Sequence, residues 1–170
     1  ETAGATYAQI GWTNPGAAMP VPDERTVWTA SRGTLTPSSP VTLTWDNGQG
    51  LVFKRRIALD ANYMFTITDV VRNERETPVS VRPLGVTRRE GLPSDYVRNQ
   101  IVHQGLLGFF GPETRRHATS FEDAQKHARN RERGRVGRDQ RIIEQEGRGG
   151  WFGVTDHYWL TAIIPDQNER

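Results

Sequence analysis

The chain has 170 residues, enough for one ordinary domain with a real hydrophobic core. Its 22 basic and 20 acidic side chains leave a net charge of only +2, which is too weak to indicate nucleic acid as a partner. The chain contains no cysteine, which excludes disulfides, thiolate catalysis and cysteine-based zinc sites. No apolar run approaches the roughly 20 residues that a membrane-spanning helix requires.

The first 40 residues are rich in Gly, Pro, Thr and Ser, a composition typical of loops. The prolines of this part lie in two stretches, "PGAAMPVP" at 15–22 and "TPSSP" at 36–40. Proline fixes φ and has no backbone N–H, so these stretches are unsuited to the interior of a sheet. Only short strands are therefore expected here, at 7–12 and 26–30.

A regular alternation of apolar and polar residues begins at Val41 and predicts an antiparallel meander of four strands. After the first strand, "DNGQG" at 46–50 contains Asn-Gly, which favours a tight hairpin because both residues tolerate positive φ. Further turns are expected at 60–62 ("DAN") and 73–78 ("NERETP"). The apolar residues that mark the strands in turn are Val41, Leu43 and Trp45; Leu51, Phe53, Ile57 and Leu59; Tyr63, Phe65, Ile67 and Val71; and Val79 and Val81.

Segment 83–112 is interrupted by prolines and contains only weak strand candidates, at 99–103 and 106–110. A short helix is expected after it, over 121–128. The signal for this helix is "SFED" at 120–123, in which the serine is a good N-cap. The aspartate three residues later takes the position of the usual capping-box glutamate.

A basic segment follows, since residues 115–141 carry nine Arg or Lys against four Asp or Glu, a local net charge of +5. It contains few aliphatic side chains and can bury little surface, so 112–146 is interpreted as a basic, poorly ordered insertion, with 129–140 exposed and mobile. A solvated loop is the favoured interpretation; contact with anionic lipid headgroups, an acidic partner or nucleic acid is the alternative. The residues of the candidate partner or lipid surface are Arg129, Arg131, Arg133, Arg135 and Arg138.

The last predicted strand, 156–164, is apolar on both of its faces. Tyr158, Leu160, Ala162 and Ile164 share one face, while Trp159 and Ile163 lie on the other. A strand of this kind is usually covered on both sides, so the pattern predicts a central strand between two layers. The residues predicted to form the buried core are Trp45, Phe53, Phe65, Tyr158, Leu160 and Ile164.

No pattern of catalytic or metal-binding residues emerges. Asp156 and His157 are candidates for an acid–base pair, but adjacent strand residues point to opposite faces, so a structural role at the strand entry is favoured. Trp12 and Trp28 are candidates for a sugar-stacking surface, although core packing is favoured. The histidines lack the spacing of metal ligands. We therefore expect no catalytic residue, no metal and no cofactor; the histidines are His103, His117, His127 and His157.

Three stretches resemble the large periplasmic domain of the YidC membrane-protein insertases of Gram-negative bacteria. They are "YAQIGWT" at 7–13, "VTLTWDNGQGLVFKRRIALDANYMFTITDVVRNE" at 41–74 and "GGWFGVTDHYWLTAIIPDQ" at 149–167. The last is the most specific, and its "TDHYWLTAIIPDQ" form is similar to alphaproteobacterial members. The positions that match the family motifs, and that the resemblance implies are structural, are Trp45, Gly48, Gly50, Tyr63, Asn73, Gly149, Gly150, Trp151, Tyr158, Trp159 and Pro165.

The resemblance implies an all-β fold with one short helix, an antiparallel β-sandwich of the galactose-mutarotase-like β-supersandwich type. It implies one periplasmic domain over 1–170, a fragment of a larger domain with strands before Glu1 and after Arg170. The implied function is non-catalytic support of membrane-protein insertion and folding at the inner membrane, with SecDF, the Sec translocon and nascent membrane proteins as partners. A carbohydrate-binding or mutarotase-like module is the alternative. The fragment is expected to be monomeric and not to bind nucleic acid.

Overall fold

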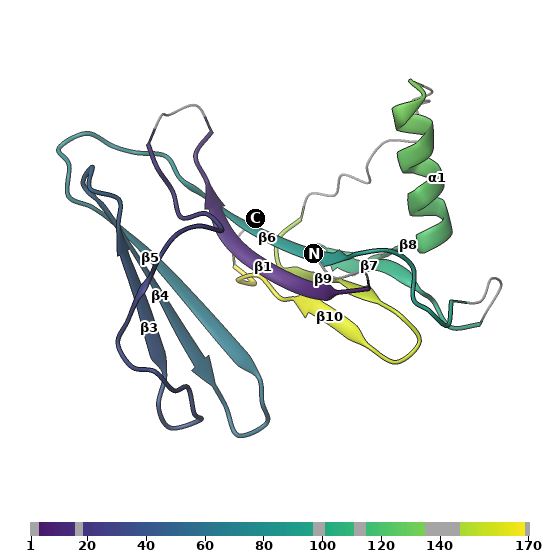
Figure 1. Ribbon diagram of the computed structural model, residues 1–170, viewed down its shortest axis with the longest axis horizontal. Helices are drawn as coiled ribbons and strands as arrows, with labels where there is room; N and C mark the ends of the chain where they lie inside the picture. The colour runs from purple at the N-terminus through teal and green to yellow at the C-terminus, as the bar shows by residue number, and fades with distance from the viewer. Residues whose placement is uncertain (1–3, 16–18, 97–100, 111–114, 135–146, 169–170) are drawn as a thin grey trace. The chain divides into compact units, whose positions relative to one another are not determined.

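The computed structural model describes residues 4–15, 19–96, 101–110, 115–134 and 147–168 (Figure 1). These residues are mostly β, with one helix of 12 residues, as the sequence predicts. The supersandwich arrangement and the single domain stay predictions. The strands are β1 (Thr6–Thr13), β2 (Thr29–Ala30), β3 (Val41–Asp46), β4 (Leu51–Leu59), β5 (Phe65–Asn73), β6 (Arg82–Arg89), β7 (Gly105–Phe110), β8 (Arg115–Ser120), β9 (Gly150–Thr155) and β10 (Leu160–Ile163), and the helix is α1 (Phe121–Glu132).

The chain packs as two compact units, which we call unit 1 (Glu1–Gln9 and Gly85–Arg170) and unit 2 (Ile10–Leu84). Strands β1 and β6 pair with each other, and each belongs partly to both units. No helix in the described ranges is long and apolar enough to cross a membrane.

Unit 2 is built on a four-stranded sheet with the order β2-β3-β4-β5. The predicted hairpin at 46–50 is confirmed: the Asp46 carboxylate accepts a hydrogen bond from the Gly48 N–H at 2.8 Å, and Gly48 has φ of 68°. The core lies on one face of β4, where Leu51 and the fully buried Phe53 pack against Trp12. Partly buried side chains surround this cluster; they are Met19, Val21, Trp28, Trp45, Val71, Val79 and Val81.

Three sequence predictions for unit 2 are wrong. Segment 79–81 is not a fourth strand of the meander; its valines pack against the core, and β2 supplies the fourth strand at the opposite edge. Tyr63 does not start the third strand, because it lies in the turn with φ of 64° and is 80% exposed. Phe65, predicted to be buried, is exposed at the start of β5, next to this turn.

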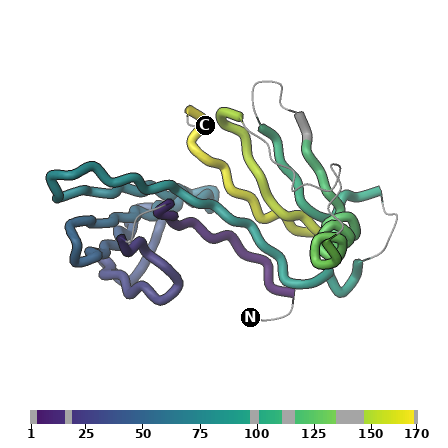
Figure 2. Tube along the Cα trace, turned by 90° about the horizontal axis from the view of Figure 1, so that it is seen from above, coloured from purple at the N-terminus to yellow at the C-terminus, as the bar shows by residue number. Residues whose placement is uncertain are grey.

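Unit 1 contains a second four-stranded sheet with the order β10-β9-β7-β8, whose strands run alongside one another in Figure 2. The candidate strand at 106–110 is confirmed as β7, whereas 101 and 102 form a bend and 99 and 100 lie outside the described residues. The pattern at 7–12 is confirmed by β1, but 26–30 contains only the two residues of β2.

The central-strand prediction for 156–164 is wrong. Residues 156–159 form a turn, and only Leu160–Ile163 continue as β10, a short strand at the edge of the sheet with β9 as its one partner. Tyr158, Leu160 and Ile164, predicted as core, are exposed in the described structure. The apolar period marks two faces but does not determine whether a neighbouring layer covers them.

Helix α1 starts where the sequence predicts. The Ser120 hydroxyl accepts a hydrogen bond from the Asp123 N–H at 3.1 Å, and Phe121 is the buried residue that fixes the first turn. The helix runs four residues beyond the predicted end. Its acidic residues Glu122 and Asp123 lie in the first turn and Arg129 and Arg131 in the last, an arrangement that opposes the helix dipole and stabilises both ends.

Candidate interaction surface

The hairpin turn between β9 and β10 is held by one carboxylate. Oδ1 of Asp156 accepts hydrogen bonds from the N–H groups of Tyr158 at 3.0 Å and Trp159 at 2.9 Å. The Asp156 N–H donates to the Trp159 carbonyl at 2.9 Å, and the Thr155 hydroxyl donates to the same carbonyl at 3.2 Å. Aspartate favours such turns because its short side chain reaches the backbone two residues on. The turn therefore has a defined conformation although Tyr158 and Trp159 are exposed.

Within unit 1, an arginine on β6 connects this turn to β1. Nη1 of Arg89 donates to Oδ2 of Asp156 and to the Thr6 hydroxyl, both at 2.9 Å. Both members of the ion pair are largely buried. A charge-assisted contact of this kind is stronger than a neutral hydrogen bond. Asp156 thus uses one oxygen to form the turn and the other to anchor it.

The turn displays two large aromatic side chains to solvent, Tyr158 at 76% exposure and Trp159 at 75%. The His157 ring stacks on Tyr158 with 4.3 Å between the centroids. Leu160, the first residue of β10, is half-exposed and follows them directly. Contiguous exposed apolar side chains on a fixed loop are typical of interaction sites. We call Tyr158, Trp159 and Leu160 the aromatic turn.

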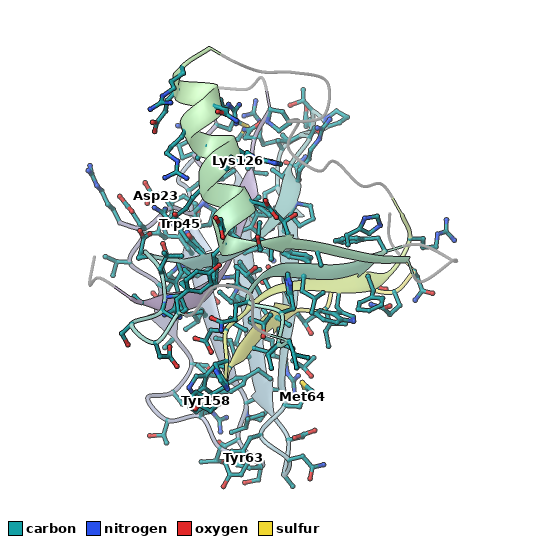
Figure 3. The ribbon with its side chains drawn as sticks, turned by 90° about the vertical axis from the view of Figure 1, so that its right-hand side faces the viewer. Asp23, Trp45, Tyr63, Met64, Lys126 and Tyr158 are labelled. Carbon is teal, nitrogen blue, oxygen red and sulfur yellow. The ribbon has the colours of Figure 1, made fainter. Side chains whose placement is uncertain are left out.

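The C-terminal part of α1 supplies exposed cations in the same unit. Lys126, Arg129, Arg131 and Arg133 are exposed, and Glu132 is the acidic residue among them. Figure 3 labels Lys126 on α1 and Tyr158 well below the helix. In Figure 1, α1 and the turn between β9 and β10 lie toward the right-hand side. We call these four basic residues the cationic helix end.

Three of the five arginines predicted to form a partner or lipid surface lie in the described part of the chain. Arg129 and Arg131 lie on α1, and Arg133 is its C-cap. Arg135 and Arg138 lie outside the described residues. Of the segment 129–140, which was predicted to be exposed and mobile, 129–132 is helical and its two arginines, Arg129 and Arg131, are exposed; its mobility stays a prediction.

Two of the family-motif positions, Gly150 and Trp151, are closely packed in the sheet of unit 1. Gly150 pairs with Phe110 across β9 and β7 at φ of 95°, and a Cβ there would lie 2.0 Å from the Phe109 carbonyl oxygen. Trp151 packs on Phe109 with 5.3 Å between centroids. The sequence predicted a bend at the glycines of this segment. It also predicted that Tyr158 and Trp159 are buried, whereas both are exposed. The "TD" before "HYW" was the available sign of a turn.

The histidines do not form a catalytic or metal-binding group. His103 contacts the Leu106 carbonyl at 3.0 Å, His117 lies beside Phe110, and His157 stacks on Tyr158. The described ranges contain no group of three or more His, Asp or Glu side chains that could hold a metal ion. Trp12 and Trp28, considered for sugar stacking, pack in the core of unit 2 instead, 6.1 Å apart.

The match to a family model and the names of the relatives agree with each other. The family model described as the YidC periplasmic domain matches residues 1–170. Relatives named Membrane protein insertase YidC include those of Caulobacter vibrioides (44% identical over 167 residues, 97% of this chain and 25% of the relative), Granulibacter bethesdensis (38% over 162 residues, 95% and 26%) and Methylobacterium nodulans (41% over 162 residues, 95% and 26%). No solved structure matches. The chain spans about a quarter of the length of these relatives. The chain belongs to the YidC periplasmic domain family.

Proposed function

We propose that this chain is a non-catalytic periplasmic module of an inner-membrane insertase, and that it supports membrane-protein insertion and folding by binding partners. The observation that carries this proposal is the family match over the whole chain. The relatives are named membrane protein insertases, and they are about four times as long as the matched segment. In those proteins the matched segment is therefore one part of a longer chain.

The chemistry of insertion favours an auxiliary role for the module, in which it binds partners and does not carry out the insertion step. Moving a polar segment into a bilayer requires ionisable or polar groups inside the hydrocarbon region, where desolvation makes them functional. The described ranges of this β-rich module contain no helix that could place such groups in a bilayer. The module offers binding surfaces instead. The proposed partners are the SecDF part of the Sec translocon and nascent membrane proteins, with an anionic lipid surface as a further contact of the basic residues.

The test is a replacement experiment in a full-length insertase that carries this module. Residues 1–170 are exchanged for a flexible Gly/Ser linker, and the chromosomal copy is depleted. We expect insertion of a model client to remain largely intact, while less SecDF co-purifies with the truncated protein. The matched control is the full-length protein with the same linker inserted after the intact module.

Two results would contradict the proposal. Complete loss of insertion, with the truncated protein still folded and in the membrane, would show that the module takes part in the insertion step. Unchanged recovery of SecDF would remove the proposed partner role.

A further inference from the structure

We propose that Asn47 is a modification site, which the closed hairpin between β3 and β4 protects from deamidation and which reacts when this hairpin opens. Asparagine followed by glycine is the sequence most prone to this reaction, because glycine has no side chain to hinder the attacking backbone nitrogen. Asn47 and Gly48 form the one Asn-Gly pair in the sequence. The proposal concerns the chemistry of unit 2 and does not depend on the function proposed above.

The reaction joins the backbone of Gly48 to the side chain of Asn47. The Gly48 nitrogen attacks Cγ of Asn47 and forms a cyclic succinimide, while the proton of this nitrogen passes through solvent to Nδ2, which leaves as ammonia. Water then opens the ring. Hydrolysis at one carbonyl gives aspartate, and hydrolysis at the other gives isoaspartate, which has an additional CH2 group in the backbone. Both products carry a carboxylate in place of the neutral amide, and the reaction needs no oxidant or reductant.

The closed hairpin restrains the attacking nitrogen. The Gly48 N–H donates to Oδ1 of Asp46 at 2.8 Å. This nitrogen must lose its proton in order to attack, and a carboxylate that accepts its hydrogen bond favours the protonated form. On the other side, the Asn47 N–H donates to the Leu51 carbonyl at 3.0 Å and fixes the backbone of the turn. The nucleophile is therefore protonated and held in place.

The carboxamide of Asn47 is held at both of its ends. Oδ1 accepts hydrogen bonds from the N–H groups of Gln49 at 2.8 Å and Leu51 at 3.0 Å. Nδ2 donates to the Pro20 carbonyl at 3.1 Å. Rotation of the side chain toward the neighbouring nitrogen breaks these hydrogen bonds. Local opening of the hairpin releases the carboxamide and the nucleophile together, so the rate of deamidation depends on how often the hairpin opens.

The hydrogen bond to Pro20 gives the modification a structural consequence. Pro20 lies between Met19 and Val21, whose side chains pack against the buried cluster of unit 2. A carboxylate at position 47 still accepts from backbone N–H groups, but it cannot donate to a carbonyl oxygen. The Pro20 carbonyl then loses its partner. Deamidation therefore weakens the attachment of a segment that covers this core, and closing the hairpin again does not restore the amide.

The first experiment follows deamidation of the chain in mildly alkaline buffer, folded and in urea, by peptide mapping with mass spectrometry. We expect Asn47 to convert at least about tenfold more slowly in the folded chain, because the hairpin must open first. Asn73 is the control in the same samples. Its carboxamide bonds to the Thr77 carbonyl and the Arg75 N–H in a similar way, but Glu74 follows it. Asn73 should therefore convert far more slowly than Asn47 in urea.

Two results of this experiment would overturn the proposal. Equal rates at Asn47 in the folded chain and in urea would show that the hairpin gives no protection. No conversion of Asn47 in urea would show that it is not a deamidation site.

A variant tests the restraint on the nucleophile. Asp46→Ala frees the Gly48 N–H, so we expect faster conversion of Asn47 in the folded chain. The matched control is Asp166→Ala, which removes the corresponding bond from the Asn168 N–H in unit 1 and should leave this rate unchanged. Urea unfolding of each variant gives the unfolded fraction, for which the rates are corrected. Unchanged or slower conversion in Asp46→Ala would show that this carboxylate does not protect the site.

A second variant tests the consequence of the modification. Asn47→Asp carries one product of the reaction and lacks the donor to the Pro20 carbonyl, so we expect a lower urea midpoint than in the wild-type chain. Gln49→Glu is the matched control, because it adds the same charge to the same turn and keeps the bond to Pro20. An equal midpoint change in the two variants, or no change in Asn47→Asp, would show that deamidation does not act through this bond.

Discussion

Arg55 and Asp69 lie opposite each other on β4 and β5 and form two parallel hydrogen bonds, Nε to Oδ1 and Nη2 to Oδ2, each 2.8 Å long. The third nitrogen, Nη1, donates to the Ile10 carbonyl at 2.7 Å. The guanidinium also lies over the Trp12 ring, 4.6 Å from its centroid. One arginine therefore connects β5, the backbone of β1 and an aromatic residue of the unit 2 core.

We predict that Asp69→Asn destabilises the chain, because it removes the charge that compensates the largely buried guanidinium of Arg55. Breaking a buried pair costs about 3–5 kcal/mol, and partial solvent access should reduce this to about 2–3 kcal/mol. Urea unfolding measures the change. The control is Glu74→Gln at the exposed Arg72–Glu74 pair, where we expect a change below about 1 kcal/mol. Equal effects of the two variants would contradict this role of Arg55.

A second prediction compares two apolar residues that the sequence placed in one core. Phe53 is fully buried, so Phe53→Ala should lower the free energy of unfolding by about 3–5 kcal/mol. Leu160 is 53% exposed, so Leu160→Ala should cost at most about 1 kcal/mol. Thermal and denaturant unfolding of both variants measure the difference. A larger effect at Leu160 than at Phe53 would show that β10 is covered by other parts of the chain.

A third prediction concerns the glycine at the start of β9. Gly150→Ala places a Cβ 2.0 Å from a backbone oxygen and adds strain at positive φ, and neither group can move freely within a sheet. We expect a loss of at least about 2–3 kcal/mol, or failure to fold. Gly11→Ala is the control, because its Cβ would meet nothing within 4 Å. Similar stability of the two variants, measured by urea unfolding, would contradict the close approach of β9 to β7.

The sequence predicted those parts of the fold that local chemistry determines. The alternation in β3 and β4, the Asn-Gly hairpin and the Ser120 cap are each encoded within a few residues, and each is confirmed. The pairing of β6 with β1 is not local, because it joins segments about 75 residues apart, and no nearby residue specifies it.

The candidate surface was missed for a related reason. A strand pattern assigns Tyr158 and Trp159 to two faces, but it cannot show whether another layer lies over either face. The sequence therefore indicated burial where the structure shows exposure. The basic residues were recognised as exposed, but the predicted helix ended at 128 and left Arg129 and Arg131 in a loop, whereas α1 continues to Glu132.

A fourth prediction concerns the loop before β2. The Thr26 hydroxyl, then the Arg25 N–H, hydrogen-bond the Asp23 carboxylate and lower its pKa below the ordinary value. A lowered pKa in the folded state stabilises the fold above the unfolded pKa, and this contribution is lost as pH falls through the folded pKa. Thr26→Ala should raise the Asp23 pKa toward its ordinary value, as followed by NMR titration. Thr29→Ala is the control, and an unchanged pKa in Thr26→Ala would assign the shift to another group.

The last prediction tests the anchor of the aromatic turn. Asp156→Ala removes both the acceptor for the Tyr158 and Trp159 amides and the partner of Arg89. We expect these two amides to exchange with solvent deuterium at least about tenfold faster, because each loses a hydrogen bond worth roughly 1–2 kcal/mol. Asp166→Ala is the matched control: that carboxylate accepts from the Asn168 N–H at 2.9 Å in an exposed turn and has no buried arginine. If exchange at Tyr158 and Trp159 is as slow in Asp156→Ala as in the control, the turn is held by packing, and Asp156 is not its anchor.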